Sequence, residues 1–317
     1  MHRQPGKIPI GISSCLLGEK VRYDGGHKKD AYITATLAEY FQFVPFCPEL
    51  ACGLGVPRPP LQLQQTELGI RCIGVRDADL DVTAALRDCA EQQSHWLSGL
   101  CGYILKKNSP SCGMQNVNIF HAGKIARTGA GLFAGFLQER FPLLPLEEED
   151  RLGNPRLCEN FLQRVQVLQR WRQMPAGLLT VQRLRDFHIR HHLLIMSRDQ
   201  ELASTLQRLV AGTEQDGIRK VADTYILRLL DGLKQTATQD DHVAVLRYSL
   251  KLLKQALKPD DNTALQAAIE NYQNRKTALA RPVELLKKHL PRSPDPVLQQ
   301  SCYLHPEPAI QALYQRI

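Results

Sequence analysis

The pattern of apolar residues changes between residues 142 and 155, and this change constrains the fold more than any other feature of the sequence. Before it, short apolar runs alternate with segments of helical spacing. After it, apolar residues recur at helical spacing, as in the series Leu246, Leu250, Leu253 and Leu257. The first pattern is typical of an α/β domain with a mostly parallel sheet, and the second of an all-α domain.

The segment "FPLLPLEEEDRLGNP" lies at this change. Two prolines, an acidic run and a Gly-Asn-Pro tripeptide disfavour a continuous helix or strand, so they indicate a domain boundary. We therefore predict an α/β domain over residues 1–148 and an all-helical domain over residues 149–317. A chain of 317 residues is long enough to bury two cores.

In the α/β domain we expect strands over 8–12, 41–46 and 102–105, and helices over 31–40 and 80–100. A cysteine follows each of these strands: Cys15, Cys47 and Cys112. Ligands of open α/β sheets gather beyond the carboxyl ends of the strands. We therefore expect these three thiols to converge.

The cysteine count points away from a disulfide framework. The chain has nine cysteines, an odd number, and its N-terminus lacks the long apolar run of a secretory signal. Metal binding or catalysis is therefore the better hypothesis, and the absence of a CxxC pair weighs against structural zinc. Three thiolates that hold a 4Fe–4S cluster would leave one iron without a protein ligand. Unrelated buried cysteines remain the alternative at this point.

Basic residues accompany two of these thiols. Lys106 and Lys107 precede Cys112, and Arg22 follows Cys15. Nearby cations favour the thiolate, so we expect them to lower the pKa of these cysteines.

Four segments in order, "SSCLLGEKVRYDGGHK", "CPE" followed by "GLGVPRPP", "KKNSPSCG" and "RTGAGLFA", resemble the bacterial 2-thiouracil desulfurase family over about the first 145 residues. The resemblance implies a 4Fe–4S cluster held by Cys15, Cys47 and Cys112. It also implies that the open iron takes the sulfur of a thiolated nucleobase and that water replaces it, giving uracil and hydrosulfide without net redox change. Cys52 falls where we expect another residue type in the family, so we assign it to packing.

This chemistry needs an acid or base near the cluster. Glu49, two residues after Cys47, is the best placed candidate, with a surface carboxylate as the alternative. Ser109 and Ser111 flank the proline before Cys112 and are candidates for substrate binding or proton transfer, although serine beside proline commonly forms turns. Of the two we favour Ser109, because the side chain of Ser111 is expected to point away from the site.

The helical half resembles the YbgA-like domain through "RLRDFHIRHHLLIMS", "YQNRKTALARPVELLKKHL" and "QQSCYLHPEPAIQAL". We expect it to be an accessory domain. His188 and His192 are four residues apart on one helix face, a spacing that also suits a metal site. Their charged neighbours favour a solvated face instead.

The sequence thus predicts a cytoplasmic, iron–sulfur-dependent desulfurase of thiolated small molecules such as 2-thiouracil, either a monomer or a homodimer. The net charge is +8, but the basic residues form no dense stripe along the sequence. This distribution argues against nucleic acid as the main partner. The alternative is a nucleic-acid-associated or thiolated-tRNA-acting protein, with a structural or sensing cluster. No apolar stretch is long enough for a membrane span.

Overall fold

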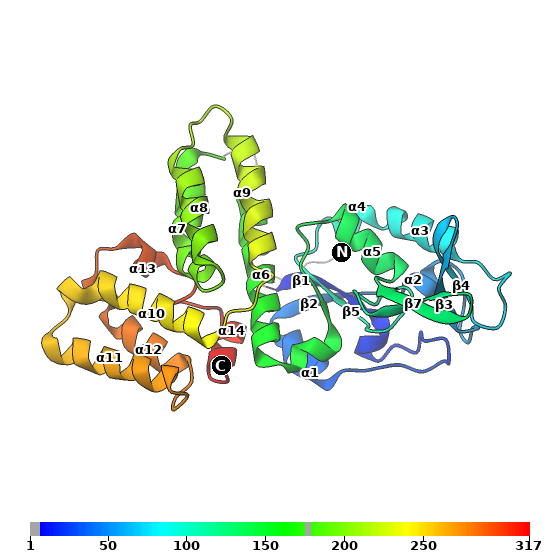
Figure 1. Ribbon diagram of the computed structural model, residues 1–317, viewed down its shortest axis with the longest axis horizontal. Coiled ribbons are helices and arrows are strands. Elements are labelled where there is room, and N and C mark those ends of the chain that lie inside the picture. The colour runs from blue at the N-terminus through cyan, green and yellow to red at the C-terminus, as the bar shows by residue number, and fades with distance from the viewer. Residues whose placement is uncertain (1–6, 175–178) are drawn as a thin grey trace. The chain divides into compact units, whose positions relative to one another are not determined.

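The computed structural model describes residues 7–174 and 179–317. The chain separates into two compact units, Met1–Gly153 and Asn154–Ile317. The first unit carries all strands of the described chain, and the second is helical (Figure 1). The predicted fold class, an α/β part followed by an all-α part, is confirmed.

Sheet A of the first unit has four strands in the order β2–β1–β5–β8, all paired in parallel. Their bounds are Phe41–Phe46 (β2), Ile8–Ser13 (β1), Tyr103–Leu105 (β5) and Leu146–Glu148 (β8). Gly11 in β1 lies against the ring of Tyr103, where an added Cβ would come within 2.2 Å of Cδ2. Glycine therefore lets the two central strands pair around a large buried side chain.

A second sheet was not expected from the sequence. Its order is β4–β3–β6–β7, with β3 and β6 parallel and the two outer pairs antiparallel. The strands are Leu61–Thr66 (β3), Gly69–Gly74 (β4), Val117–His121 (β6) and Lys124–Gly129 (β7). Many of their side chains are polar and half-exposed, so the apolar runs that identified sheet A are absent here.

The helices of the first unit are Ala31–Ala35 (α1), Pro48–Ala51 (α2), Thr83–Gln92 (α3), Ser94–Leu97 (α4) and Leu132–Arg140 (α5). The helix expected over 31–40 is thus shorter, and the one expected over 80–100 is divided into α3 and α4. Glu149 and Asp150 belong to the first unit, and they form ion pairs with Lys106 and Lys107 after β5.

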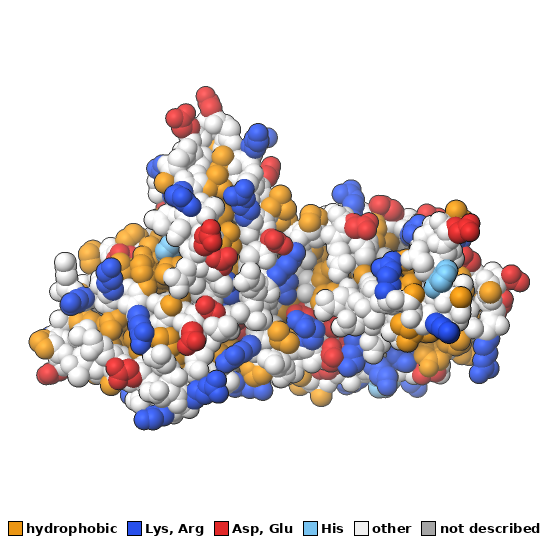
Figure 2. All heavy atoms as spheres, in the orientation of Figure 1, with side chains coloured by type: hydrophobic (Ala, Val, Ile, Leu, Met, Phe, Trp, Pro, Cys, Tyr) orange, Lys and Arg blue, Asp and Glu red, His pale blue; other side chains and the backbone are white. Residues whose placement is uncertain are grey.

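The main helices of the second unit are Pro155–Gln173 (α6), Val181–Met196 (α7), Gln200–Ala211 (α8), Ile218–Gly232 (α9), Gln239–Leu253 (α10), Pro259–Gln273 (α11), Ala280–His289 (α12), Pro296–Gln300 (α13) and Pro308–Tyr314 (α14). Helices α7, α8 and α9 lie side by side, and so do α10, α11 and α12 (Figure 1). On the face shown in Figure 2, basic and acidic side chains are interspersed over these helices. No helix of the described chain is long and apolar enough to cross a membrane.

Candidate functional site

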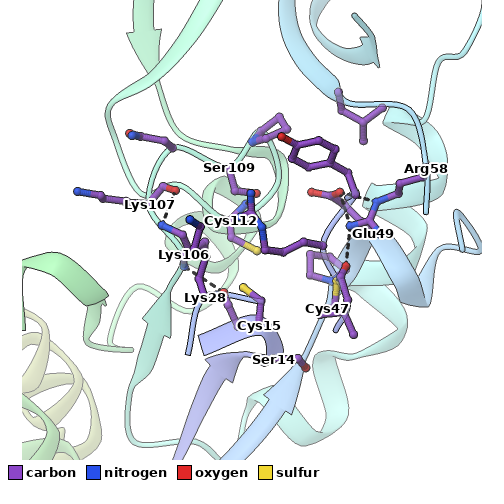
Figure 3. A pocket seen from close by; sticks show the side chains of 18 of the residues that line it. Ser14, Cys15, Lys28, Cys47, Glu49, Arg58, Lys106, Lys107, Ser109 and Cys112 are labelled. Carbon is purple, nitrogen blue, oxygen red and sulfur yellow. Dashed lines mark hydrogen bonds and ion pairs between the residues drawn. The ribbon is translucent and has the colours of Figure 1, made fainter. Parts of the chain in front are cut away.

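Three cysteines line one cavity at the carboxyl edge of sheet A. Cys15 lies in the 3-10 helix after β1, Cys47 directly after β2, and Cys112 in the loop after β5. Because β2, β1 and β5 are parallel neighbours, their carboxyl ends bring these loops together. The cavity has a volume of about 360 Å³ and is lined by all three residues (Figure 3).

Burial dominates the electrostatics of these thiols. Loss of hydration raises the pKa of Cys15 to about 11, and proximity to Cys47 adds to the effect. Burial also raises the pKa of Cys47, and it raises the pKa of Cys112 well above its usual value. The thiols are therefore protonated at neutral pH unless a bound cation stabilises the thiolates.

The expected effect of the basic neighbours is outweighed. Lys106 and Arg22 do act to lower the pKa of Cys15, but desolvation has the larger influence and the net shift is upward. Lys107 forms a 2.9 Å ion pair with Asp150 at the surface, and Lys106 pairs with Glu149. The expected direction of the effect on Cys15 is thus confirmed for Lys106 and Arg22, but burial outweighs it.

The donor set fits an iron–sulfur cluster better than a single metal ion. In the part of the chain that the structure describes, no three His, Cys, Asp or Glu side chains are placed to hold one ion. The ligands of a cluster bind different iron atoms, so their sulfurs lie farther apart than the ligands of zinc. Three thiols line one cavity, and thiolates are the soft donors that bind the irons of such a cluster.

Glu49 lies in the wall of the same cavity, in the first turn of α2. Its Oε2 accepts a 2.9 Å hydrogen bond from Nε of Arg58 and lies 2.8 Å from Nη2 of the same guanidinium. Its Oε1 accepts a 2.9 Å hydrogen bond from the hydroxyl of Ser111. Arg58 and Ser111 thus hold the carboxylate in one orientation, and Figure 3 shows its contact with Arg58.

Ser109 and Ser111 occupy different environments. Ser109 lines the cavity. Its hydroxyl oxygen accepts hydrogen bonds from the backbone N–H groups of Ser111 and Cys112, at 3.2 and 3.1 Å. Ser111 is fully buried, and its side chain points to Glu49 rather than away from the site. Ser109 thus shapes the turn, whereas Ser111 contacts the carboxylate.

Arg58 is a site residue that the sequence reasoning missed. It is 8% exposed, and besides Glu49 it donates to the carbonyl oxygens of Gly55 and Val21, each at 2.9 Å. The signal in the sequence was an arginine flanked by prolines in "GLGVPRPP". Prolines restrict the backbone on both sides of Arg58, and a solvated surface arginine would not need its backbone fixed in this way.

The start of α5 holds the Cys112 turn in place. The N–H groups of Leu132 and Phe133 donate to the carbonyl oxygens of Pro110 and Ser111, at 3.0 and 2.9 Å. These are donors that an α-helix leaves without partners in its first turn. The segment "RTGAGLFA" therefore belongs to the site because it supports "KKNSPSCG" from behind.

Cys52 lies outside the cavity lining. Its thiol donates a 3.3 Å hydrogen bond to the carbonyl oxygen of Glu49, and its side chain packs against an apolar cluster that contains Leu63 and Cys72. This environment agrees with a packing role.

The histidines of α7 are buried, so the expected solvated face is wrong. Nδ1 of His188 lies 3.1 Å from the hydroxyl of Tyr225, and Nε2 of His188 lies 3.4 Å from Nδ1 of His192. His191 is fully buried and bonds to the carbonyl oxygen of Phe187 at 2.7 Å. The side chains form a polar chain within the helical core.

Known proteins resemble both parts of the chain. Residues 10–149 match the family model for 2-thiouracil desulfurase, and residues 192–308 match a model described as a protein of unknown function, DUF1722. The uncharacterized protein YbbK of Bacillus subtilis (strain 168) is 32% identical over 141 residues, which make up 41% of this chain and 89% of YbbK. A solved structure of the 4Fe–4S-dependent thiouracil desulfidase TudS is 33% identical, covers 46% of this chain and 94% of its own, and has a TM-score of 0.38.

Proposed function

The chain belongs to the 2-thiouracil desulfurase family, and on this premise we propose that its first unit removes sulfur from a thiolated pyrimidine such as 2-thiouracil. The observation that carries the proposal is the cavity shared by Cys15, Cys47, Cys112 and Glu49. Cys15, Cys47 and Cys112 would hold a 4Fe–4S cluster. Such a cluster supplies a soft Lewis acid at the iron that has no cysteine ligand.

Glu49 is the proposed general base. The reaction exchanges the sulfur of a C=S group for the oxygen of water, and the sulfur leaves as hydrosulfide, so no electrons are gained or lost. Water must lose protons as its oxygen bonds to carbon, and a carboxylate in the cavity wall accepts one of them. The contacts with Arg58 and Ser111 keep that carboxylate aimed.

The second unit is proposed as an accessory domain of a cytoplasmic protein, which acts as a monomer or homodimer. A reducing compartment suits a cluster with three cysteine ligands and an open iron, because oxidation of the cysteine thiolates would release the cluster from the protein. The domain division at residues 148 and 149 is part of the same proposal.

A second candidate substrate is a thiolated nucleotide within RNA. The described residues that line the cavity include several cations: Arg22, Lys28, Arg58, Lys106 and Lys107. The acidic residue Glu49 lines the same cavity. Arg58, Lys106 and Lys107 form ion pairs with Glu49, Glu149 and Asp150, so Lys28 and Arg22 are the cations proposed to contact phosphate groups.

The test is hydrosulfide release by protein purified without oxygen and carrying about four irons per chain. Free 2-thiouracil should yield uracil and hydrosulfide, and Glu49→Gln should keep the brown colour yet lose about 10²–10⁴-fold in turnover. Thiolated RNA is assayed in parallel, and preference for it over the free base selects the second candidate. A colourless protein that binds zinc would refute both.

A further inference from the structure

One buried guanidinium contacts two of the three cysteine loops. Nη2 of Arg58 donates to the carbonyl oxygen of Val21, in the loop that follows Cys15. The same group pairs with Glu49, two residues after Cys47. The Cys47 thiol also points to the Val21 carbonyl oxygen, at 3.9 Å. Arg58 therefore joins the first two loops in the wall of the cavity.

Glu49 extends this connection to the third loop. Its Oε1 accepts from Ser111, which directly precedes Cys112. A chain of contacts thus runs from the Cys15 loop through Arg58 and Glu49 to the Cys112 turn. The side chains of Arg58 and Glu49 are 4% and 13% exposed, so water competes little for these contacts.

The arrangement also selects one oxygen of Glu49. An ionised carboxylate has about four acceptor positions, two on each oxygen. Arg58 approaches Oε2 with two nitrogens, whereas Ser111 occupies one position of Oε1. The second acceptor position of Oε1 therefore has no contact with Arg58 or Ser111, and it can accept a proton from a water molecule in the cavity.

We propose that Arg58 is a positioning residue, which directs Oε1 of Glu49 into the cavity and joins the loops of Cys15, Cys47 and Cys112. The inference rests on the proposed function for its catalytic part. A lysine would not replace Arg58, because one ammonium group lacks the planar fork that reaches a carboxylate and a carbonyl at once.

The matched control is Arg71. It pairs with Asp81 in the same geometry, with Nε at 2.7 Å and Nη2 at 2.6 Å from one oxygen, but it lies on β4 and does not line the cavity. Arg71→Ala therefore removes an ion pair of the same geometry, though a more exposed one, from the same unit without touching the site.

The experiment compares iron-loaded wild type, Arg58→Ala, Arg58→Lys and Arg71→Ala. Both Arg58 variants should lose about 10–100-fold in kcat for 2-thiouracil with little change in KM, as expected when a supporting contact of a catalytic group is removed. Free guanidinium should restore part of the kcat of Arg58→Ala. In a Glu49→Gln background, Arg58→Ala should cost almost nothing more, because the residue it positions has already lost its function.

Iron loss to a chelator gives a readout independent of turnover. It should be several-fold faster in both Arg58 variants than in wild type or Arg71→Ala. If Arg58→Ala does not load iron, Arg58→Lys decides. Arg58 variants with wild-type kcat and wild-type iron loss overturn the inference. A loaded wild type that acts on no thiopyrimidine and no thiolated RNA refutes the proposed function instead, and the chelator comparison still tests the joining of the loops.

Discussion

Ser111 and Glu49 are 62 residues apart in the sequence, yet the Ser111 hydroxyl donates a 2.9 Å hydrogen bond to Oε1 of Glu49. The serine is fully buried, so this contact does not exchange with water. It joins the turn that carries Cys112 to the helix that follows Cys47. The proposed base and two proposed ligands are thereby part of one rigid arrangement.

This relationship separates the roles of the two serines. Ser111→Ala should lower kcat even when compared at matched iron content, because Glu49 loses the donor that orients Oε1. Ser109→Ala should instead lower the melting temperature and iron retention, since it removes two hydrogen bonds worth about 1 kcal/mol each. Turnover at matched iron content and thermal unfolding distinguish the two. The opposite pattern would make Ser109 the residue that supports the chemistry.

The order of short apolar runs was enough to predict β1, β2 and β5 of sheet A and the loops of the three cysteines. It did not predict β8, which lies in the segment assigned to the domain boundary. Apolar strands in a parallel sheet are buried on both faces, so they are visible in a single sequence. The second sheet, formed by β4, β3, β6 and β7, was missed because many of its side chains are polar and at least partly exposed, most of all in β7 (Lys124–Gly129). The helical half was visible for the same reason as sheet A, through its periodic leucines.

Side-chain directions were beyond the sequence. Ser111 was expected to point away from the site, and Arg58 was not considered, because each acts through a partner from another loop. Burial was also underestimated: His188 has charged neighbours in sequence, but its helix packs that side against Tyr225. Such tertiary contacts leave no periodic signal in the chain.

Replacement of single cysteines by alanine distinguishes the proposed cluster ligands from the cysteine assigned to packing. Cys15→Ala, Cys47→Ala and Cys112→Ala should each lose most of the iron, because three thiolates are the minimum for the proposed cluster. Cys52→Ala should keep it, since its thiol bonds to a backbone carbonyl and packs in an apolar cluster. Iron, acid-labile sulfide and visible absorbance per chain provide the measurement. Loss of iron in Cys52→Ala with retention in Cys47→Ala would reverse the assignment of the second ligand.

The buried histidines make the helical unit sensitive to acid. Burial lowers the pKa of His188 from 6.5 to about 4, so between these values the unfolded chain binds a proton that the folded chain does not. The stability contributed by neutral His188 is complete above pH 6.5 and is lost as the pH falls toward 4. The loss at about pH 5 is about 2 kcal/mol.

Trp171 offers a local probe of this effect, because it packs against Phe187 and Tyr225 within the helical unit. In a Trp96→Phe background, its fluorescence reports urea unfolding of that unit. Lowering the pH from about 7.5 to about 5 should reduce the free energy of unfolding less in His188→Gln than in the parent. An equal reduction in both would show that His188 is not the group that titrates.

The last prediction concerns the support behind the Cys112 turn. A Cβ added at Gly131 would lie 2.6 Å from the carbonyl carbon and oxygen of Ser111 and 2.8 Å from the Pro110 oxygen. These are backbone atoms, so the turn itself must move. Gly131→Ala should therefore displace Cys112 and lose iron. Gly131 is also the N-cap residue of α5, a position where alanine is less favourable than glycine.

Gly135→Ala is the matched control on the same helix. Its added Cβ would meet only the Cβ of Ala130, at 3.9 Å, which is an ordinary contact. Replacing a glycine inside a helix by alanine stabilises the helix by up to about 1 kcal/mol, so this variant should melt no lower than wild type and keep its iron. Iron per chain and melting temperature are measured for both variants. If Gly131→Ala loads iron as fully as Gly135→Ala, the start of α5 does not hold the turn, and the close approach of "RTGAGLFA" to "KKNSPSCG" serves packing alone.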